Sequence, residues 1–276
     1  MSGAAPPDAG SDAAEWNRVA EKWLDHNPHP LWREHSDAVN TRLLEQWLPC
    51  PPVQRILKTD LFDEAVSRGL VPVLSNYAEH VIAIDVAPTA VGSAARKYPA
   101  LAAGSADVRA LPCESGSFDA VVSLSTLDHF ENARDISSAL SELFRVLKPN
   151  GMLILTLDNG ANPIVAVRNA LPYALTHAIG LVPYPVGRTL TPGRARAAVT
   201  RAAVTRAGFT VSEMITIMHS PRVLAVPLMS AVEKRAWRSL QDGILRTALA
   251  FERLGSLRTR RLTGHFIAIR ANKPAA

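Results

Sequence analysis

Four polar residues directly follow one apolar stretch, residues 118–124 (FDAVVSL): Ser125, Thr126, Asp128 and His129. The stretch is short, rich in valine and opened by a Gly-Ser pair, which predicts a strand of a parallel sheet buried on both faces. Open α/β sheets bind ligands beyond the carboxyl ends of such strands. His129 is therefore a candidate general base, with Asp128 as its orienter or substitute. The alternative is a histidine that only packs against the next helix.

A second candidate is the acid that ends residues 81–85 (VIAID), which also predict a buried strand. Pro88 then opens a helix expected to reach Tyr98. A carboxylate at the end of such a strand can accept both hydroxyls of a ribose, as in nucleotide-binding βαβ units. Asp85 is therefore a candidate ligand of a nucleoside, and the alternative is a solvated acid at a strand end.

A third candidate is the turn between the strand expected at 53–57 and the helix expected at 61–68, which Gly69 closes. It reads Lys58-Thr59-Asp60-Leu61-Phe62-Asp63-Glu64, with no glycine. Asp60 could contact a ligand or serve as the N-cap of the helix. The next two acids lie in the first helical turn, where the helix dipole favours carboxylates.

The elements around these candidates alternate along the chain. Helical periodicity predicts helices at 13–24, 36–48 and 133–147, and residues 26–35 (HNPHPLWREH) between the first two are too Pro-rich for a helix. Strands are expected at 152–157, 209–218 and 265–271, and helices over much of 224–257 and 191–208, with shorter pieces at 165–170 and 173–179. This order fits an open α/β sheet that ends in an antiparallel strand.

Two segments carry a resemblance to a known family. The pattern "aD…LP…sFDaVvS…H" and the string ELFRVLKPNGMLILTLDN resemble class I S-adenosylmethionine (SAM)-dependent methyltransferases, in particular the ubiquinone/menaquinone-biosynthesis-like group called methyltransferase type 11. The resemblance implies a Rossmann-like seven-stranded open sheet with helices on both faces. It also implies an N-terminal helical lid at 13–50 and a methyltransferase domain at 51–276, with helical elaborations at 159–208 and 222–262. The tryptophans of 13–50 could equally anchor those helices to the core.

The same resemblance assigns roles to individual residues. It implies SAM as the cofactor, with Asp85 on the ribose, Asp107 on the adenine amino group and Asp60 on the methionine ammonium. Lys58 would pair with the methionine carboxylate or with Asp60. The further cofactor contacts that it implies are Thr59, Val86, Val108, Ser123 and Ser125. The family's motif at this turn, approximately D-x-G-x-G-x-G, has none of its glycines here, and Phe62 stands at one of their positions.

Charge is divided unevenly between the two halves of the chain. Residues 160–276 hold 17 lysines and arginines against 4 acids, whereas residues 1–159 hold 13 against 21. A basic half can face an anionic substrate, an acidic partner, nucleic acid or a membrane surface, or can be a solvated arginine-rich surface. The asymmetry favours an anionic acceptor, and the resemblance implies that the acceptor is a small molecule. Methyltransferases of this kind have substrate-selecting insertions at 159–190, so the resemblance implies as candidate acceptor contacts Asn159, Asn162, Arg168, His177, Tyr184 and Arg188.

Cysteine spacing and the absence of long apolar runs predict where the protein is found in the cell. The two cysteines form no metal or disulfide spacing, residues 1–12 are expected to be disordered, and no secretory signal or apolar run of membrane-spanning length is visible, so a cytoplasmic protein is expected. Two other functions stay open. Loss of the glycines would suit a catalytically inactive, methyltransferase-like binding or scaffolding protein. An RNA methyltransferase ranks below it, because no RNA-binding module is recognisable. The sequence does not predict an oligomeric state.

Overall fold

The computed structural model describes residues 9–26, 29–130, 133–171, 175, 201–235 and 238–275. The candidates His177, Tyr184 and Arg188 lie outside the described residues, as do most of the helix expected at 173–179 and the first part of that expected at 191–208. The segment expected to be disordered, 1–12, is described from residue 9, where the first helix already begins.

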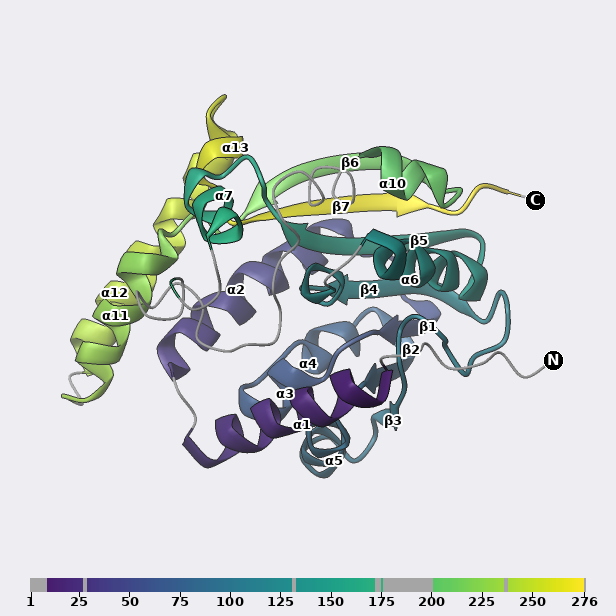
Figure 1. Cartoon of the computed structure of the whole chain (residues 1–276), viewed down its shortest axis with the longest axis horizontal. Coiled ribbons are helices and arrows are strands. Elements are labelled where there is room, and N and C mark those ends of the chain that lie inside the picture. The colour runs from purple at the N-terminus through teal and green to yellow at the C-terminus, as the bar shows by residue number, and fades with distance from the viewer. Residues whose placement is uncertain are drawn as a thin grey trace.

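Seven strands form one sheet in the order β3-β2-β1-β4-β5-β7-β6 (Figure 1). Their bounds are β1 Val53–Lys58, β2 Ala78–Asp85, β3 Ala102–Ser105, β4 Phe118–Leu124, β5 Leu147–Asp158, β6 Thr210–Ile217 and β7 Phe266–Asn272. Strands β1 to β5 pair in parallel, and β7 runs antiparallel to both β5 and β6. The predicted Rossmann-like sheet with an antiparallel strand near its edge is confirmed.

The central parallel strands are buried on both faces where their side chains alternate between two apolar clusters, whereas the edge strand β3 is mostly exposed. On β1, Ile56 joins one cluster and Leu57 the other; on β4, Val122 and Val121 divide in the same way. Strand β4 has the bounds that its valine-rich sequence predicts.

Helices cover both faces of this sheet, as predicted (Figure 1). Their bounds are α1 Ala9–His26, α2 Pro30–Trp47, α3 Phe62–Val66, α4 Val71–Leu74, α5 Pro88–Lys97, α6 Ala133–Val146, α7 Pro163–Ala170, α10 Arg201–Arg206, α11 Arg222–Glu233, α12 Arg238–Ala250 and α13 Arg260–Thr263, with short 3-10 helices at Leu127–His129 and Phe251–Ser256. The stripe of α6 and the residues of α10 pack on one face; α2, α4, α11 and α12 pack on the other.

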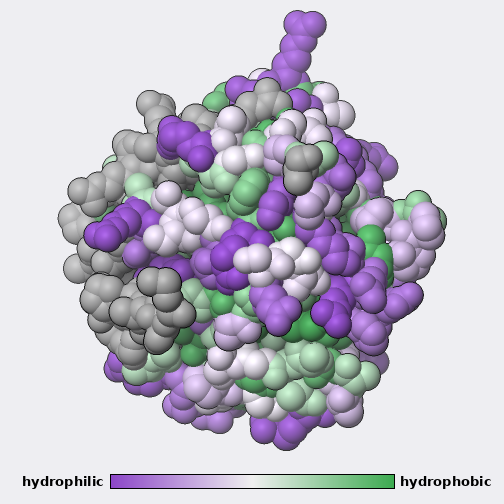
Figure 2. Space-filling model, turned by 90° about the vertical axis from the view of Figure 1, so that its right-hand side faces the viewer, coloured by the Kyte–Doolittle hydropathy of each residue, from purple (hydrophilic) through white to green (hydrophobic). Residues whose placement is uncertain are grey.

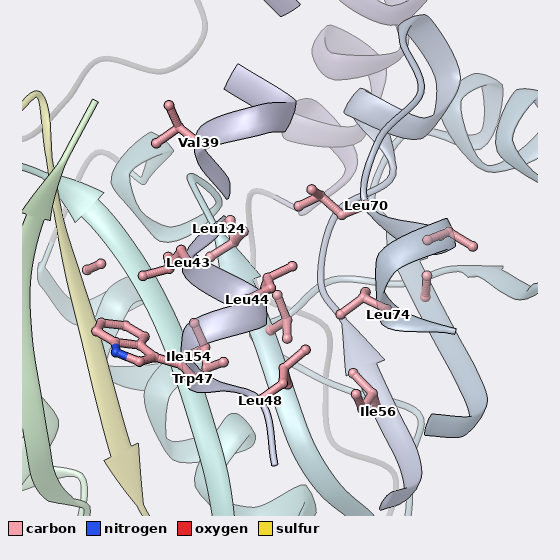
Figure 3. Close-up of a cluster of buried hydrophobic side chains, with 14 of the residues drawn as sticks. Val39, Leu43, Leu44, Trp47, Leu48, Ile56, Leu70, Leu74, Leu124 and Ile154 are labelled. Carbon is pink, nitrogen blue, oxygen red and sulfur yellow. The ribbon is translucent and has the colours of Figure 1, made fainter. Parts of the chain in front are cut away.

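Helix α2 differs from the prediction in where it begins and in what it does. It starts at Pro30, so the expectation that residues 26–35 are not helical was wrong for 30–35; a proline is compatible with the first helical turn, where its missing N–H has no partner to lose. Leu43, Leu44 and Trp47 are at most 3% exposed and point toward β1, β4 and β5 (Figure 3). Helix α2 therefore belongs to the core, in agreement with the alternative that its tryptophans anchor it there.

Other bounds also differ from those predicted, and three of them bear on the site or the sheet. Strand β3 ends at Ser105, so Asp107 lies two residues beyond it and not at its end. The helix expected at 61–68 is α3, which ends at Val66. Strand β5 begins at Leu147, five residues early, because Asn150 takes a left-handed conformation and pairing with β4 resumes beyond the resulting irregularity.

Candidate active site

The candidate residues meet where the strand order reverses, between β1 and its neighbour β4. Thr59 follows β1, and its hydroxyl donates to the Ser123 hydroxyl at 2.8 Å and lies 3.2 Å from the Thr126 hydroxyl. Ser123 and Thr59 are buried. Doubly wound sheets open a crevice at such a reversal. The turn after β1 and the polar residues after β4 therefore form one continuous edge.

Lys58 is the centre of the glycine-less turn. Its ammonium lies 2.9 Å from Asp60 Oδ1 and 2.8 Å from Glu64 Oε2, and donates to the Asp60 carbonyl at 2.7 Å. The Lys58 and Glu64 side chains are at most 1% exposed. The other oxygen of Glu64 accepts the backbone N–H groups of Leu70 and Val71. Of the two partners predicted for Lys58, the structure has Asp60, and it adds Glu64, which the sequence did not suggest as a partner.

These groups leave the turn with one uncompensated negative charge. Asp63 forms an ion pair with Arg33 of α2 at 2.5 Å, and Lys58 is shared by Asp60 and Glu64. Burial raises the pKa of Asp60 to about 7, against the opposing effect of Lys58. Asp60 Oδ2 is buried and has no hydrogen-bond partner among the described residues. Leu61, not Asp60, occupies the N-cap position of α3, so the capping alternative is wrong.

Phe62 replaces a family glycine without strain because helix α1 covers it. Its ring lies 5.4 Å from that of Trp23, edge to face, and the Arg33 guanidinium lies over both rings. Trp16 and Ala20 of α1 pack in the same small cluster, together with Ala90 of α5 and its N-cap residue Ala87. The large side chain therefore holds α1 over the end of the sheet.

Asp85 is buried at the end of β2 and already accepts two backbone hydrogen bonds. One carboxylate oxygen accepts from the Leu61 N–H and the other from the Ala87 N–H, each at 2.8 Å. Burial raises the pKa of Asp85, and the two backbone donors act against that rise. Val86, which follows, is half-buried. Asp85 thus ties the turn after β1 to the start of α5, and its contact with a ribose stays a prediction.

Asp107 forms an ion pair with a residue that the sequence reading did not consider. Arg109 Nη2 lies 2.7 Å from Asp107 Oδ2, and the Arg109 backbone N–H donates to Asp107 Oδ1 at 2.8 Å. Arg109 is buried below the Phe130 ring, and Val108 between the two residues is buried as well. The Asp107 side chain keeps 13% exposure, and its contact with adenine stays a prediction.

Ser125 has the strained backbone of the site. Its φ of 52° lies in the left-handed region, which costs a serine about 1 kcal/mol. Its N–H donates to Thr156 Oγ1 at 2.8 Å, and its hydroxyl donates to Asp128 Oδ2 at 3.0 Å. These bonds hold the chain in place as it leaves β4. Burial raises the pKa of Asp128, whose Oδ1 has no partner within the part of the chain that the structure describes.

His129 faces helix α1. Its ring meets the Trp16 ring edge to face, with centroids 4.8 Å apart. Its Nδ1 is buried and unpartnered among the described groups, and none of the hydrogen bonds found there joins it to Asp128. The packing alternative thus has a contact in its favour, and the role of His129 as a base stays a prediction.

A buried polar group at the end of β5 escaped the sequence analysis. Asp158 forms an ion pair with Arg168 of α7, and His265 Nε2 lies 3.7 Å from Asp158 Oδ1. Burial lowers the pKa of His265 to about 3, against the effect of Asp158. The rule that singled out Asp85, a polar residue at a strand's carboxyl end, could have found Asp158.

Besides Arg168, two predicted acceptor contacts have partners within the protein. The Asn159 side chain donates to the carbonyls of Arg261 and Gly264. The Asn162 side chain caps α7 and also donates to the Gly264 carbonyl. They join α7 to α13, so a further contact of either with an acceptor stays a prediction.

Within the described ranges, no three histidines, cysteines or acids are grouped so that they could hold a metal ion. None of the helices described there has the length and apolarity needed to cross a bilayer.

Comparisons with known proteins agree with this fold. Residues 67–155 match the family model described as a methyltransferase domain. The malonyl-[acyl-carrier protein] O-methyltransferase of Enterobacter lignolyticus is 30% identical over 151 residues, which are 55% of this chain and 55% of that protein. An S-adenosylmethionine-dependent methyltransferase from Mesorhizobium loti superposes with a TM-score of 0.55 at 17% identity, over 86% of this chain and 99% of that one.

A second similar structure is a complex with an anionic molecule. Phosphoethanolamine N-methyltransferase 2 of Haemonchus contortus, in complex with phosphomonomethylethanolamine and S-adenosylhomocysteine, has a TM-score of 0.56 at 16% identity, over 98% of this chain and 60% of that one. The fold is thus that of class I methyltransferases. Residues 67–155 of the chain thus form a methyltransferase domain. The chain spans about half the length of the curated relative with the longer match.

The turn after β1 suits SAM in two respects: its net charge is opposite to that of SAM, and one carboxylate oxygen of Asp60 has no partner among the described residues. SAM has an ammonium, a sulfonium and a carboxylate, hence one net positive charge, opposite to that of the turn. Its ammonium is the kind of donor that Asp60 Oδ2 lacks. The oxygens of Asp85 and Asp107 are already in use, but a carboxylate has about four acceptor positions, so each can accept from a nucleoside as well.

Proposed function

We propose that this protein transfers the methyl group of SAM to a small, anionic acceptor. The observation that carries the proposal is the polar edge at the switch point, where a methyltransferase domain holds buried, unpartnered atoms of Asp60, Asp128 and His129 among its described residues. Leaving a buried polar atom unpaired costs about 1–3 kcal/mol, so such atoms together in one crevice point to a ligand that pairs with them.

The cofactor-holding part of the proposal concerns the β1 and β2 side of the crevice. Asp60 would accept from the ammonium of SAM, and Asp85 and Asp107 from its ribose and adenine. Bound SAM supplies an electrophilic methyl group on a positively charged sulfur. Lys58 and Glu64 act indirectly, because their buried pair sets the position of Asp60.

The acceptor part concerns the β4 and β5 side. His129 would take a proton from the acceptor at Nδ1 or Nε2, if the acceptor carries one, while Asp128 keeps Ser125 and the start of the loop in place. Helix α1, through Trp16, would exclude water from this side. The positive charge of residues 160–276 supports an anionic acceptor, as do the malonyl and phospho groups in the names of the two relatives.

A second candidate function is a methyltransferase-like protein without catalysis. The observation in its favour is that Lys58, Asp85 and Asp107 all have partners within the protein. It predicts no SAM binding, so cofactor binding separates the two candidates.

The experiment is a calorimetric titration with SAM and S-adenosylhomocysteine, followed by a methyl-transfer assay with small carboxylates and phosphomonoesters. We expect micromolar binding that Asp85→Ala and Asp107→Ala each weaken about tenfold. Asp119→Ala is the matched control, because Asp119 lies at the amino end of β4, on the opposite edge, paired with Lys148. Binding without transfer to any anionic acceptor would contradict the acceptor class, and absence of binding would favour the second candidate.

A further inference from the structure

Two helices at one end of the molecule turn apolar side chains to solvent. Every exposed position of α11 is apolar: Val223, Leu224, Pro227, Leu228 and Ala231. Leu224 is 69% exposed and Leu228 53%. The opposite face of the same helix is also apolar, with Met229 and Val232 buried against the core. A surface helix ordinarily has a polar face toward solvent, and α11 has none.

Helix α7 repeats this pattern. Its exposed positions with described side chains are Pro163, Ile164, Val167 and Ala170, and Val167 is 52% exposed. By contrast, the exposed positions of α12 are mostly polar, including Ser239, Asp242 and Thr247. The apolar outer face is thus a property of α7 and α11, whereas α12 has one exposed leucine, Leu240, among its polar positions.

Both helices approach the same buried histidine. Arg168 of α7 and Arg222 at the start of α11 both act electrostatically on His265, so both helices approach that residue. The α7 cap, Asn162, bonds to the carbonyl of Thr263 in α13. Figure 1 shows α7, α11, α12 and α13 together at one end of the sheet. The face in Figure 2, on the far side of the molecule from these helices, has hydrophilic side chains interspersed among its apolar ones.

Positive charge surrounds these apolar faces. The exposed basic residues of 222–261 are Lys234, Arg235, Arg238, Arg246, Arg253, Arg258, Arg260 and Arg261. Asp242 is the one exposed acid among the residues described in that range. Glu233 is half-buried and accepts from the Leu31 N–H, and Glu252 accepts from Met218 and His219. Apolar side chains flanked by cations are the pattern of helices that lie in the surface of an anionic bilayer.

We propose that the face formed by α7, α11 and α13 docks on an anionic phospholipid surface, with Leu224, Leu228 and Val167 entering the acyl boundary and the surrounding arginines meeting lipid phosphates. The charge complementarity favours this occupant. The apolar set also lacks the tyrosines and tryptophans that dominate protein interfaces, and its members are aliphatic residues on the outer sides of helices. The proposal does not depend on methyl transfer.

The test is flotation of the full chain with vesicles of phosphatidylcholine and phosphatidylglycerol in equal parts, against vesicles of phosphatidylcholine alone. We expect at least about tenfold tighter association with the anionic vesicles, reduced by salt. The double variant Leu224→Asp/Leu228→Asp should weaken association at least about tenfold. The matched control Ser239→Asp/Thr247→Asp adds the same charge on the exposed polar face of α12 and should weaken it far less.

The proposed contact of arginines with lipid phosphates is tested by the triple variant Arg258→Glu/Arg260→Glu/Arg261→Glu. This variant should lose most of the preference for anionic vesicles. Helical content and thermal midpoint confirm that each variant is folded, and Leu224→Ser/Leu228→Ser replaces the aspartate pair if that pair unfolds. Absence of vesicle binding, equal binding to both vesicle types, or an equal effect of the α12 control would overturn the proposal. So would a wild-type dimer that Leu224→Asp/Leu228→Asp dissociates, because α11 would then be covered by a second copy.

Discussion

At the scale of single residues, the glycine-less turn is held by an ion pair that is almost fully removed from water. Glu64 is 0% exposed and compensates Lys58 while also accepting two backbone N–H groups. Breaking a buried pair on one side leaves an uncompensated charge, which costs about 3–5 kcal/mol.

Glu64→Gln should therefore lower the free energy of unfolding by about 3 kcal/mol in a urea titration followed by circular dichroism. Glu79→Gln, at an exposed position of β2, is the control and should change it by less than about 0.5 kcal/mol. A loss as small as that of the control would mean that the pair does not hold the turn.

At the scale of elements, helix α1 is fixed to the domain through few side chains. Trp16 contacts His129 and the small cluster around Phe62, and Asn17 accepts from the Thr89 N–H at 2.8 Å. Removing the indole should loosen α1 by about 2 kcal/mol without unfolding the sheet.

Limited proteolysis of Trp16→Ala should accordingly show cleavage within 9–26 at least about tenfold faster than in the wild type, with the sheet intact. Arg18→Ala, at an exposed position of the same helix, is the control. Unchanged cleavage would show that α1 is not held by Trp16 and would remove the basis for its role as a lid.

Helix α2 contains a histidine that the core keeps neutral. His35 is 0% exposed, and burial lowers its pKa to about 4. The unfolded chain takes up a proton near its ordinary value of 6.5 while the folded chain does not, so this residue costs stability as the pH falls below 6.5. The cost continues to grow until the pH approaches the folded value of about 4.

The change in unfolding free energy between about pH 7 and pH 5 should thus be smaller in His35→Leu than in the wild type by about 2 kcal/mol. The comparison is between the two pH profiles, because other groups titrate in both proteins. His80→Leu, at an exposed position of β2, is the control. Parallel profiles for His35→Leu and the wild type would contradict a neutral, buried His35.

At the scale of the whole molecule, sequence patterns predicted most of the sheet and less of the site. Strand β4 has its predicted bounds because valines buried on both faces leave a continuous apolar run. Acids at strand ends, such as Asp85, were predicted because they follow directly after such an apolar run. Partners from distant segments were not, because no spacing links Arg33 to Asp63 or His265 to Asp158. The start of helix α2 was predicted wrongly because the sequence does not distinguish a proline in a helix interior, which breaks the helix, from a proline in its first turn, which is tolerated.

The fold also separates the charges of the chain. The turn after β1 carries net negative charge beside the proposed cofactor site, and the exposed cations gather on α11 to α13. If SAM binds at that turn, its positive charge should favour the ionised form of Asp60, whose pKa is about 7 without ligand. Affinity should then rise severalfold between about pH 6 and pH 7.5 as Asp60 loses its proton.

The most direct measurement is a calorimetric titration of the full chain with SAM at those two pH values, repeated on Asp60→Asn and on the control Asp119→Asn. The expected result is micromolar binding that strengthens with pH in the wild type and in the control. In Asp60→Asn it should be at least about tenfold weaker and nearly independent of pH. Binding that Asp60→Asn leaves unchanged would contradict the role of the turn, and no binding in any of the three proteins would contradict the proposed activity itself.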